Sequence, residues 1–460
     1  MRWLTILITT GALALAPVAQ AETRVPQSQA EISLGFAPLV KQAAPAVVNI
    51  YAKIVHQGSS NPFADDPFFR DFFRGFGTPR PRVQNSLGSG VILTSDGIVV
   101  SNYHVVGQAT DIRVVTADRK EYDAKVVLGD ANADLAILQL QDAQDLPHLA
   151  LRNSDHVEVG ELVLAIGNPF GVGQTVSSGI VSGLARSGAG QGQGRGYYIQ
   201  TDAPINPGNS GGALIDVNGD LIGINTRILS RSGGSNGIGF AIPANLVGEF
   251  LHQAQAGQDR FAFPWAGMGG QPVDADLAAS LGLDLPEGIV ISDLHPDSPF
   301  LAAGFKVGDV ITDVDGLPVN TPPEMIFRMT VAGIGQTAQV TRGGDDQVIQ
   351  VQMIAPPDTP DAERLVLDDD TALPGLAVAR INPAVMVETG LPLSASGVAV
   401  TDPGPYGARA GLQPGDVIEQ INGREIIRSR DVRKALTRPG RKVQIELKRR
   451  GGRVTLRFRL

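Results

Sequence analysis

The 460-residue chain contains no cysteine. This absence excludes disulfides, thiol nucleophiles and thiolate metal sites, so the hydrophobic cores alone must stabilise the folded domains. Aromatic residues are scarce, at 5% of the sequence. Beyond the N-terminal segment, no apolar run approaches the roughly 20 residues that a membrane-spanning helix needs. We therefore expect a soluble mature protein with no thiol chemistry, and the sequence contains no signal for a metal or an organic cofactor.

The N-terminal residues have the three parts of a secretory signal peptide. An early cation precedes an apolar run from Trp3 to Ala16, and the small-x-small triplet AQA follows at residues 19–21. A retained membrane anchor is the alternative, but the run is too short to cross a bilayer and the triplet suits signal peptidase. The sequence therefore predicts a cleaved signal peptide over residues 1–21 and a periplasmic location.

Positive charge is concentrated at the C-terminal end of an otherwise acidic chain. The net charge is −9, yet residues 424–460 hold 14 Lys and Arg against three acidic residues. Such a face could contact an anionic membrane surface, although a solvated face is the simpler interpretation. Export argues against nucleic acid as a partner.

Short β-branched runs separated by Gly, Asn and Ser fill residues 45–250. Many strands at near-even spacing predict an antiparallel barrel or sandwich rather than alternating strands and helices. Residues 243–257 have helical apolar spacing and end at a glycine, which predicts a closing helix.

A sequence repeat follows this strand-rich region. The segments AGFKVGDVITDVDG (residues 303–316) and AGLQPGDVIEQING (residues 410–423) match at an offset of 107. Two copies of a module of about 90 residues are the simplest explanation. The Pro- and Asp-rich residues 357–371 are expected to link the two copies.

The segment INPGNSGG, residues 205–212, is a candidate nucleophile turn. Glycines around Ser210 allow the backbone amides of Gly208 and Ser210 to converge, as they do in an oxyanion hole. The bare Gly-x-Ser-x-Gly pattern also matches the nucleophile elbow of α/β-hydrolases, in which Asp or Glu and then His follow the serine. Only His252 and His295 follow Ser210, one in a predicted helix and one in a repeat module, so this esterase-like alternative is disfavoured.

A second set of residues upstream fits Ser210 better. His104 follows the run GIVVSNY, and Asp134 begins the apolar run DLAILQL. The order His104, Asp134, Ser210 is that of the chymotrypsin-type triad, in which the serine attacks, the histidine takes its proton and the aspartate orients the imidazole. A strand-end histidine and a turn aspartate are the alternatives for each residue alone. An aspartate before four apolar residues is drawn inward and needs a partner there, for which a histidine ring is suitable.

Several longer motifs together resemble the HtrA (Deg) family of exported serine proteases. They are SNYHVV, DANADLAIL, IGNPFGVGQTVSSGIVSG, QTDAPINPGNSGGALIDVNGDLIGINT and GIGFAIP. The resemblance covers nearly the whole mature chain and implies a mostly β fold, with a chymotrypsin-like double β-barrel protease domain followed by two PDZ domains. The implied organisation is a signal peptide (1–21), a protease domain (22–260) with a long regulatory loop (57–85), a first PDZ domain (261–356), a linker (357–371) and a second PDZ domain (372–460).

The resemblance also implies substrate-binding positions. Trypsin-like cleavage after Lys or Arg uses an aspartate six residues before the serine, and this chain has Pro204 there, so a preference for small aliphatic residues is expected. The candidate walls of the pocket are Ile224, Asn225, Thr226 and Ile238, the last as its floor. The candidate peptide-carboxylate loops are WAGM at 265–268, with Ala266, Gly267 and Met268, and LPGL at 373–376. Pro374 removes one amide donor from the second loop, so the first PDZ domain is the better candidate for ligand capture.

A phenylalanine-rich segment, NPFADDPFFRDFFRGFG at residues 61–77, falls in the predicted regulatory loop. Its aromatic residues are expected on one stripe of a short helix. One hypothesis is that this stripe contacts a neighbouring subunit in a resting oligomer, and the alternative is packing on its own barrel.

The sequence therefore favours an ATP-independent serine endopeptidase that degrades misfolded exported proteins, with a holding activity. By resemblance it is a homo-oligomer built on trimers, and its partners are unfolded proteins and exposed C-termini. The alternative is a chaperone or scaffold with an idle triad, which is disfavoured because all three catalytic residues are present.

Overall fold

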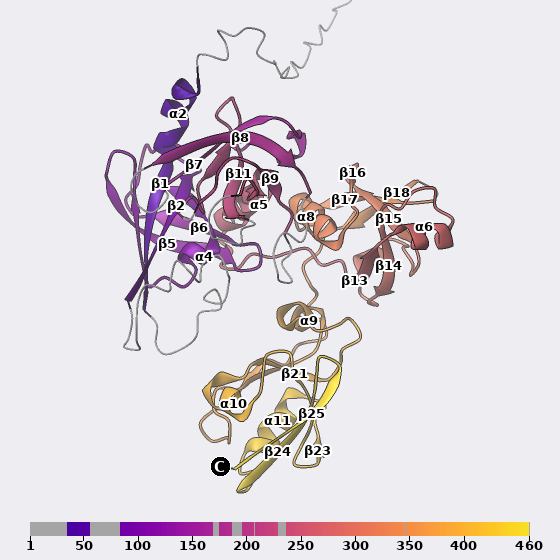
Figure 1. Cartoon of the computed structure of the whole chain (residues 1–460). Coiled ribbons are helices and arrows are strands. Elements are labelled where there is room, and N and C mark those ends of the chain that lie inside the picture. The colour runs from indigo at the N-terminus through magenta and orange to yellow at the C-terminus, as the bar shows by residue number, and fades with distance from the viewer. Residues whose placement is uncertain are drawn as a thin grey trace, which may run out of the picture.

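The computed structural model describes residues 35–55, 83–168, 174–185, 196–206, 208–228, 236–344 and 346–459. Figure 1 shows a two-barrel body in its N-terminal half, followed by two separate sheet modules that carry the rest of the chain. We call them the first module (residues 265–354) and the second module (residues 357–459). The predicted signal peptide and the phenylalanine-rich segment lie outside the described residues.

The first barrel closes by pairing its first and fourth strands. The strand order is β1-β2-β3-β6-β5-β4, and β1 pairs with both β2 and β4. Strands such as DIRVV alternate exposed and buried residues, so one face packs inside the barrel. The elements are α2 (Ala37–Ala43), η1 (Ala44–Ala46), β1 (Val47–Val55), β2 (Val83–Ile92), β3 (Ile98–Ser101), α4 (Tyr103–Val106), β4 (Asp111–Val115), β5 (Glu121–Asp130) and β6 (Leu135–Leu140).

The second barrel has the same closed form, with the order β10-β11-β12-β9-β8-β7 and β10 paired to β7. Its closing helix is α5, as the apolar spacing of residues 243–257 predicts. The elements are η2 (Ser154–His156), β7 (Leu162–Gly167), β8 (Thr175–Gly183), β9 (Ile199–Thr201), β10 (Ala213–Ile215), β11 (Leu221–Ile228), β12 (Gly239–Pro243) and α5 (Ala244–Gln255).

A large apolar core joins the two barrels. It contains Val100 and Ile137 from the first barrel, Ile166 and Ile224 from the second, and Phe250 from α5. Each barrel also has its own smaller core. The two barrels are therefore joined by packed side chains. This close packing allows residues from both barrels to meet at one rigid site.

The first module is a sheet with the order β13-β14-β15-β17-β18, in which β16 pairs with β15. Its helix α8 packs against the two-barrel body, where Phe327 stacks on Tyr197 with ring centroids 4.0 Å apart. Arg328 on the same helix pairs with Asp155 and donates to the Tyr197 hydroxyl. The elements are β13 (Met268–Pro272), α6 (Ala275–Leu281), β14 (Ile289–Leu294), α7 (Pro299–Ala302), β15 (Val310–Val314), β16 (Leu317–Pro318), α8 (Pro322–Ala332), β17 (Thr337–Arg342) and β18 (Gln347–Gln352).

The second module repeats this plan with the order β19-β20-β21-β22-β24-β25. The repeated GDVI segments lead into the equivalent strands β15 and β22, as two copies of one module predict. The elements are β19 (Leu365–Val366), β20 (Ala377–Arg380), α9 (Pro383–Thr389), β21 (Val398–Asp402), α10 (Gly404–Ala410), β22 (Val417–Ile421), β23 (Arg424–Glu425), α11 (Ser429–Leu436), β24 (Lys442–Arg449) and β25 (Gly452–Arg459).

Two predicted boundaries differ from the observed elements. The stretch expected as a linker, 357–371, contains β19, and Leu367 is buried in the second module's core. The regulatory loop was expected to end at residue 85, whereas β2 already begins at Val83. In both places the segment forms backbone hydrogen bonds to a neighbouring strand, β1 for β2 and β20 for β19, and local composition does not reveal this pairing. None of the helices in the described residues has the length and hydrophobicity needed to span a bilayer.

Candidate active site

His104 and Asp134 meet at the inner edge of the first barrel. His104 lies on the short helix α4, and Asp134 lies in the turn that leads from β5 into β6. Asp134 has a positive φ of 55°, and its carbonyl accepts hydrogen bonds from the Tyr103 amide and the Asn102 side chain. These bonds tie the turn to the start of α4. The strained backbone of Asp134 is therefore held in place by the helix that carries its partner.

The Asp134 carboxylate is buried and receives several hydrogen bonds. His104 Nδ1 lies 2.9 Å from each of its oxygens, and the His104 amide donates to Oδ1 at 3.0 Å. The Thr226 hydroxyl donates to Oδ2 at 2.6 Å. Burial alone would raise the pKa of Asp134, but the charge of His104 and the hydrogen bonds from His104 and Thr226 outweigh it and lower the pKa. The site thus keeps Asp134 ionised beside the ring.

Ser210 sits in a turn that only glycine at the next position allows. Gly211 has φ 83°, and a Cβ added there would lie 2.1 Å from the Ser89 carbonyl oxygen. The Gly211 amide donates to the Asn225 carbonyl at 2.8 Å, and the Ser89 amide donates to the Ser210 carbonyl at 2.9 Å. Ser89 belongs to the first barrel and Asn225 to the second. The nucleophile turn is therefore fixed from both barrels.

The Gly208 peptide is oriented by the same serine of β2. The Ser89 hydroxyl donates to the Gly208 carbonyl at 2.7 Å and accepts from the Asn168 amide at 2.9 Å. Gly208 has φ 101°, a conformation that L side chains rarely adopt. Within the described residues, the amides of Gly208 and Ser210 donate a hydrogen bond to no protein group. Both amides are available to bind an oxygen outside the chain.

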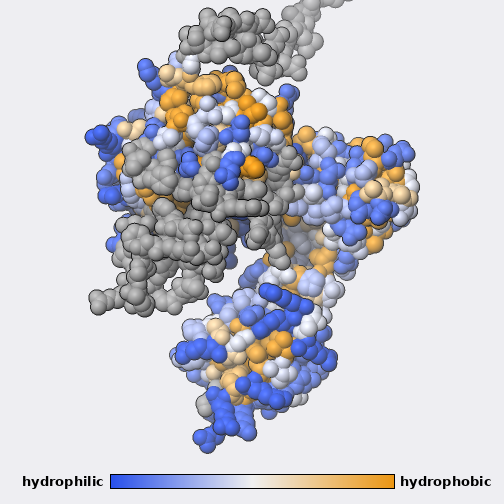
Figure 2. Space-filling model, in the orientation of Figure 1, coloured by the Kyte–Doolittle hydropathy of each residue, from blue (hydrophilic) through white to orange (hydrophobic). Residues whose placement is uncertain are grey.

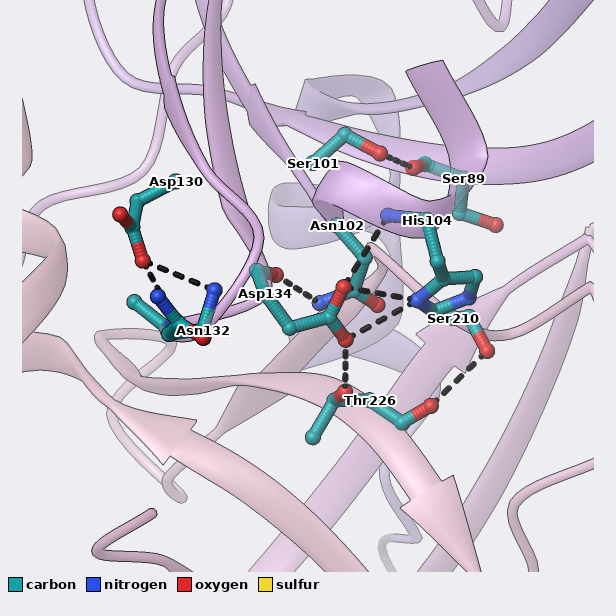
Figure 3. Close-up of polar contacts among 10 residues, drawn as sticks. Ser89, Ser101, Asn102, His104, Asp130, Asn132, Asp134, Ser210 and Thr226 are labelled. Atoms are coloured by element: carbon teal, nitrogen blue, oxygen red, sulfur yellow. Dashed lines mark hydrogen bonds and ion pairs between the residues drawn. The ribbon is translucent and has the colours of Figure 1, made fainter. Parts of the chain in front are cut away.

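Thr226 connects the acid to the nucleophile (Figure 3). The pairing of β11 with β12 shifts between Asn225 and Arg227, so Thr226 is the extra residue of a β-bulge, a device that redirects a side chain. Its hydroxyl binds Asp134, and its carbonyl accepts the Ser210 hydroxyl at 3.0 Å. Figure 3 places Ser210 on the side of the His104 ring away from Asp134. The three predicted triad residues are thus brought to one place, although His104 and Ser210 belong to different barrels.

Two of the predicted pocket walls do not lie where a substrate could contact them. Ile224 is fully buried in the core between the barrels, so its side chain does not face a substrate. Asn225 is also buried, and its amide side chain donates to the Ala213 carbonyl. Successive side chains of β11 point to opposite faces, so Ile224 packs in the core between the barrels while Asn225 is buried on the other face, where its side chain binds the backbone of β10. Ile238 is half-buried at the entrance to β12 and remains a candidate pocket residue.

The loop at residues 265–268 precedes the edge strand β13 of the first module. Gly267 has φ 59°, and a Cβ there would lie 2.8 Å from the Trp265 ring. The Ala266 carbonyl accepts the Ser298 hydroxyl, and the Gly267 carbonyl accepts the His295 amide. In the described residues the amides of Ala266 and Gly267 donate to no protein group. The loop therefore turns its carbonyls into the module and leaves two amides open.

Sequence reasoning missed Ser89 and misassigned Thr226. Ser89 stands in the ordinary-looking triplet GSG at residues 88–90, and nothing local marks it. Thr226 was proposed as a substrate wall, whereas its side chain binds Asp134. A threonine within a run of buried strand residues was the only available signal, since a buried hydroxyl needs a partner. No group of three or more His, Asp or Glu side chains in the described ranges is arranged to hold a metal ion.

The paired barrels, the Asp134–His104 pair beside Ser210 and the two sheet modules define a trypsin-like serine peptidase with two PDZ domains. Family models agree: a trypsin-like peptidase domain matches residues 88–224, and PDZ domains match residues 266–353 and 397–449. The chain belongs to the HtrA (Deg) family of serine endoproteases. It is 35% identical over 486 residues to a probable periplasmic serine endoprotease DegP-like of Pseudomonas fluorescens, covering 100% of this chain and 98% of that protein.

Two further relatives support this assignment. The periplasmic pH-dependent serine endoprotease DegQ of Escherichia coli is 36% identical over 406 residues, covering 87% of this chain and 86% of its own. Among solved structures, the HtrA-type protease AlgW with a decapeptide is 40% identical, with a TM-score of 0.52. That match covers 70% of this chain and 99% of AlgW. From here the first and second modules are called the first and second PDZ domains.

Proposed function

We propose that this protein is an ATP-independent endopeptidase that degrades misfolded or unfolded proteins in the periplasm and also holds them in solution. The observation that carries the proposal is the buried Asp134–His104 pair joined through Thr226 to Ser210. An idle site would not need a buried carboxylate kept ionised against the cost of burial. The location follows from the predicted signal peptide and from relatives that are named periplasmic.

The residues supply each step of acyl transfer. Ser210 Oγ turns from the Thr226 carbonyl toward His104 and attacks the peptide carbonyl carbon, while His104 Nε2 takes its proton. The tetrahedral oxygen is stabilised by the amides of Gly208 and Ser210. His104 then protonates the leaving amine, and an acyl-enzyme forms on Ser210. Water activated by the same ring releases the acyl group. Asp134 holds the imidazole tautomer throughout and stays ionised.

Cleavage is proposed to follow small aliphatic residues. Pro204 occupies the position at which a trypsin would carry its aspartate, and the Pro204 carbonyl accepts the Ser177 hydroxyl at 2.7 Å. This arrangement offers no carboxylate to a basic side chain there. Ile238 is apolar and only half-buried, which supports an aliphatic pocket.

The first PDZ domain is proposed to bind extended substrate ends. Its strand β13 is the outermost strand of the sheet, so a peptide can add beside it. The open amides of Ala266 and Gly267 lie at the start of this strand and suit a terminal carboxylate. Met268 begins the strand that would pair with the peptide. These contacts would bring unfolded chains to the protease domain and regulate it.

We propose a homo-oligomer built on trimers. Figure 2 shows an apolar area on the upper part of the protease domain, where Figure 1 places α2 and β8. Phe36, Leu39 and Val40 on or beside α2 are only half-buried although they pack on the main core. A second copy could cover them. The basic C-terminal region is proposed to make at most weak contact with an anionic membrane surface.

The deciding experiment is digestion of reduced casein by the wild type and by Ser210→Ala, with fragment ends identified by mass spectrometry. We expect that only the wild type cuts, mostly after Val, Ala or Ile, without ATP. If both proteins hold casein in solution and neither cuts it, the chain is a PDZ-bearing chaperone with an idle triad. Cleavage by Ser210→Ala would remove Ser210 from its proposed role.

A further inference from the structure

The second PDZ domain differs from the first at the strand edge that would receive a peptide. In the first domain no described strand pairs with the outer edge of β13. The equivalent strand of the second domain is β20, because β20 pairs with β21 as β13 pairs with β14. The outer edge of β20 is covered by β19. The chain itself therefore takes the place of an added peptide strand in the second domain.

The covering strand is short and antiparallel to β20. It comprises two residues, with Leu365 opposite Val378 and Val366 opposite Ala377. Side chains along it alternate as they do in a bound peptide, since Val366 is 60% exposed while the next residue, Leu367, is 2% exposed. The segment therefore points one side chain outward and the following one into the domain.

Leu367 uses the amide that a ligand carboxylate would need. Its carbonyl accepts the Gly375 amide at 2.8 Å, and its own amide donates to the Leu376 carbonyl at 2.9 Å. Gly375 and Leu376 belong to the loop LPGL, the counterpart of the open loop in the first domain. Pro374 in this loop has no amide to offer. The polar end of the groove is thus satisfied from within the chain.

The Leu367 side chain is buried in the core of the second domain. It belongs to one buried cluster with Leu376 of the loop and with Val432 and Leu436 of α11. This helix is the counterpart of α8 in the first domain, since both follow the paired GDVI strand in the same order. Leu367 therefore lies among residues of both the loop and the helix, as the last side chain of a captured peptide would.

An ion pair holds the segment on the outside of α11. Arg433 lies 2.7 Å from an Asp368 carboxylate oxygen and 3.5 Å from one of Asp370. The Ala372 amide then donates to the Leu436 carbonyl at the end of the helix. Both partners of the ion pair are largely solvent-exposed, so the pair stabilises the segment only weakly. We call this ion pair, Arg433 with Asp368 and Asp370, the latch.

We propose that residues 365–370 are a built-in ligand of the second PDZ domain, and that this domain accepts an extended peptide with an aliphatic terminal residue and a free carboxylate only when the segment lifts away. This deepens the proposed peptide-binding function and rests on it. The second domain then binds peptide only at high peptide concentration, when residues 365–370 are displaced. The first domain binds peptide without any such displacement.

Thiol labelling measures whether the segment lifts on its own. The chain has no cysteine, so each variant carries a single thiol. In full-length Ser210→Ala, we expect Leu367→Cys to react more slowly than the exposed Val366→Cys but faster than Leu436→Cys, which opens only when the whole domain unfolds. Equal rates for Leu367→Cys and Leu436→Cys would mean that β19 is an inseparable strand, and the proposal would be overturned.

The latch provides a second variant that does not disturb the core. Removing an exposed ion pair with Arg433→Ala should raise the Leu367→Cys rate by about two- to fivefold and leave the Leu436→Cys rate unchanged. Lys434→Ala is the matched control, because Lys434 lies on the same helix and pairs only loosely with Asp431. An equal effect of both substitutions would refute the latch.

Competition by a free peptide tests whether residues 365–370 occupy a peptide-binding site. The probe is the free hexapeptide AERLVL, which has the sequence of residues 362–367 and ends in a carboxylate. It should accelerate Leu367→Cys labelling to a plateau, and its C-terminal amide should be much weaker. If the segment lifts but the peptide leaves the rate unchanged, the segment is not a ligand mimic and the proposal fails.

Binding of the same peptide at the first domain is read separately. Apart from Trp3 in the predicted signal peptide, Trp265 is the only tryptophan, and it stands in the first domain's loop. A change in Trp265 fluorescence without faster labelling would support the proposed peptide-binding function and overturn the built-in ligand. Faster labelling with no change at Trp265 would support the built-in ligand and count against capture by the first domain.

Discussion

Thr226 offers the sharpest test of how the site works. Thr226→Val keeps the side-chain shape and removes the 2.6 Å hydrogen bond to Asp134. A hydrogen bond to a charged group contributes about 1.5–3 kcal/mol. In the transition state the His104 ring is positively charged. If the whole free energy of this hydrogen bond is lost from the transition state, kcat/KM falls by about 10- to 150-fold. We expect the loss in kcat rather than in KM, because the hydroxyl does not touch the substrate.

The same substitution should change stability in a pH-dependent way. The lowered pKa of Asp134 means that its ionised form is favoured in the folded state, so it contributes stability above the unfolded pKa of about 3.9. That contribution is lost as the pH falls through the folded pKa. The difference in unfolding free energy between wild type and Thr226→Val should therefore be full near neutral pH and shrink below about pH 4.

The assay is steady-state cleavage of a peptide with an aliphatic cleavage site, together with urea unfolding on the Ser210→Ala background. Thr226→Ser should restore most of the rate because it restores the hydroxyl. Thr201→Val is the matched control, since the buried Thr201 hydroxyl donates to the Ile180 carbonyl in the second barrel and not to a triad residue. A wild-type rate for Thr226→Val, or an equal loss of rate for Thr201→Val, would refute the positioning role.

Three further changes test other parts of the structure. Asp134→Asn should lower kcat by about 10³- to 10⁴-fold at neutral pH, because the imidazole loses the partner that sets its tautomer, as steady-state kinetics will show. Ser89→Ala should lower kcat by roughly tenfold, since it releases the Gly208 carbonyl and loosens the amides that bind the oxyanion, and KM should change little. Arg328→Ala breaks the buried pair with Asp155 between the first PDZ domain and the protease domain; it should destabilise that contact by about 3 kcal/mol and speed limited proteolysis of the junction.

The Ser89→Ala and Arg328→Ala changes each have a control on the same fold. Ser178→Ala removes an exposed hydroxyl of β8 and should leave kcat unchanged. Arg113→Ala breaks an exposed pair with Glu121 and should leave the junction as resistant to proteolysis as in the wild type. Full activity in Asp134→Asn would contradict the assignment of the acid. Junction cleavage that is unaffected by Arg328→Ala would show that the pair with Asp155 does not hold the contact.

The order of motifs along the chain was enough to predict the main features of the protein. Punctuated β-branched runs predict an antiparallel barrel or sandwich, because period-two burial is a local property of strands, and the resemblance to the HtrA family selects the double barrel. The GDVI repeat predicts two copies of one module, and both copies are present as sheets. The triad candidates His104, Asp134 and Ser210 were chosen from their order along the chain and from the resemblance to the HtrA family, since each residue alone has another interpretation.

Only the tertiary structure decided how the site is supported. Ser89 and Gly208 are 119 positions apart, and Thr226 and Asp134 are 92 apart, so no local pattern connects them. The bulge at Thr226 turns a presumed substrate wall toward the acid. In the same way, residues whose composition predicts a linker form β19, because the open edge of β20 offers hydrogen bonds that the segment can satisfy. Local sequence pattern predicts most of the strands and helices, whereas hydrogen bonds between segments decide whether a short strand such as β19 forms and which side chains meet.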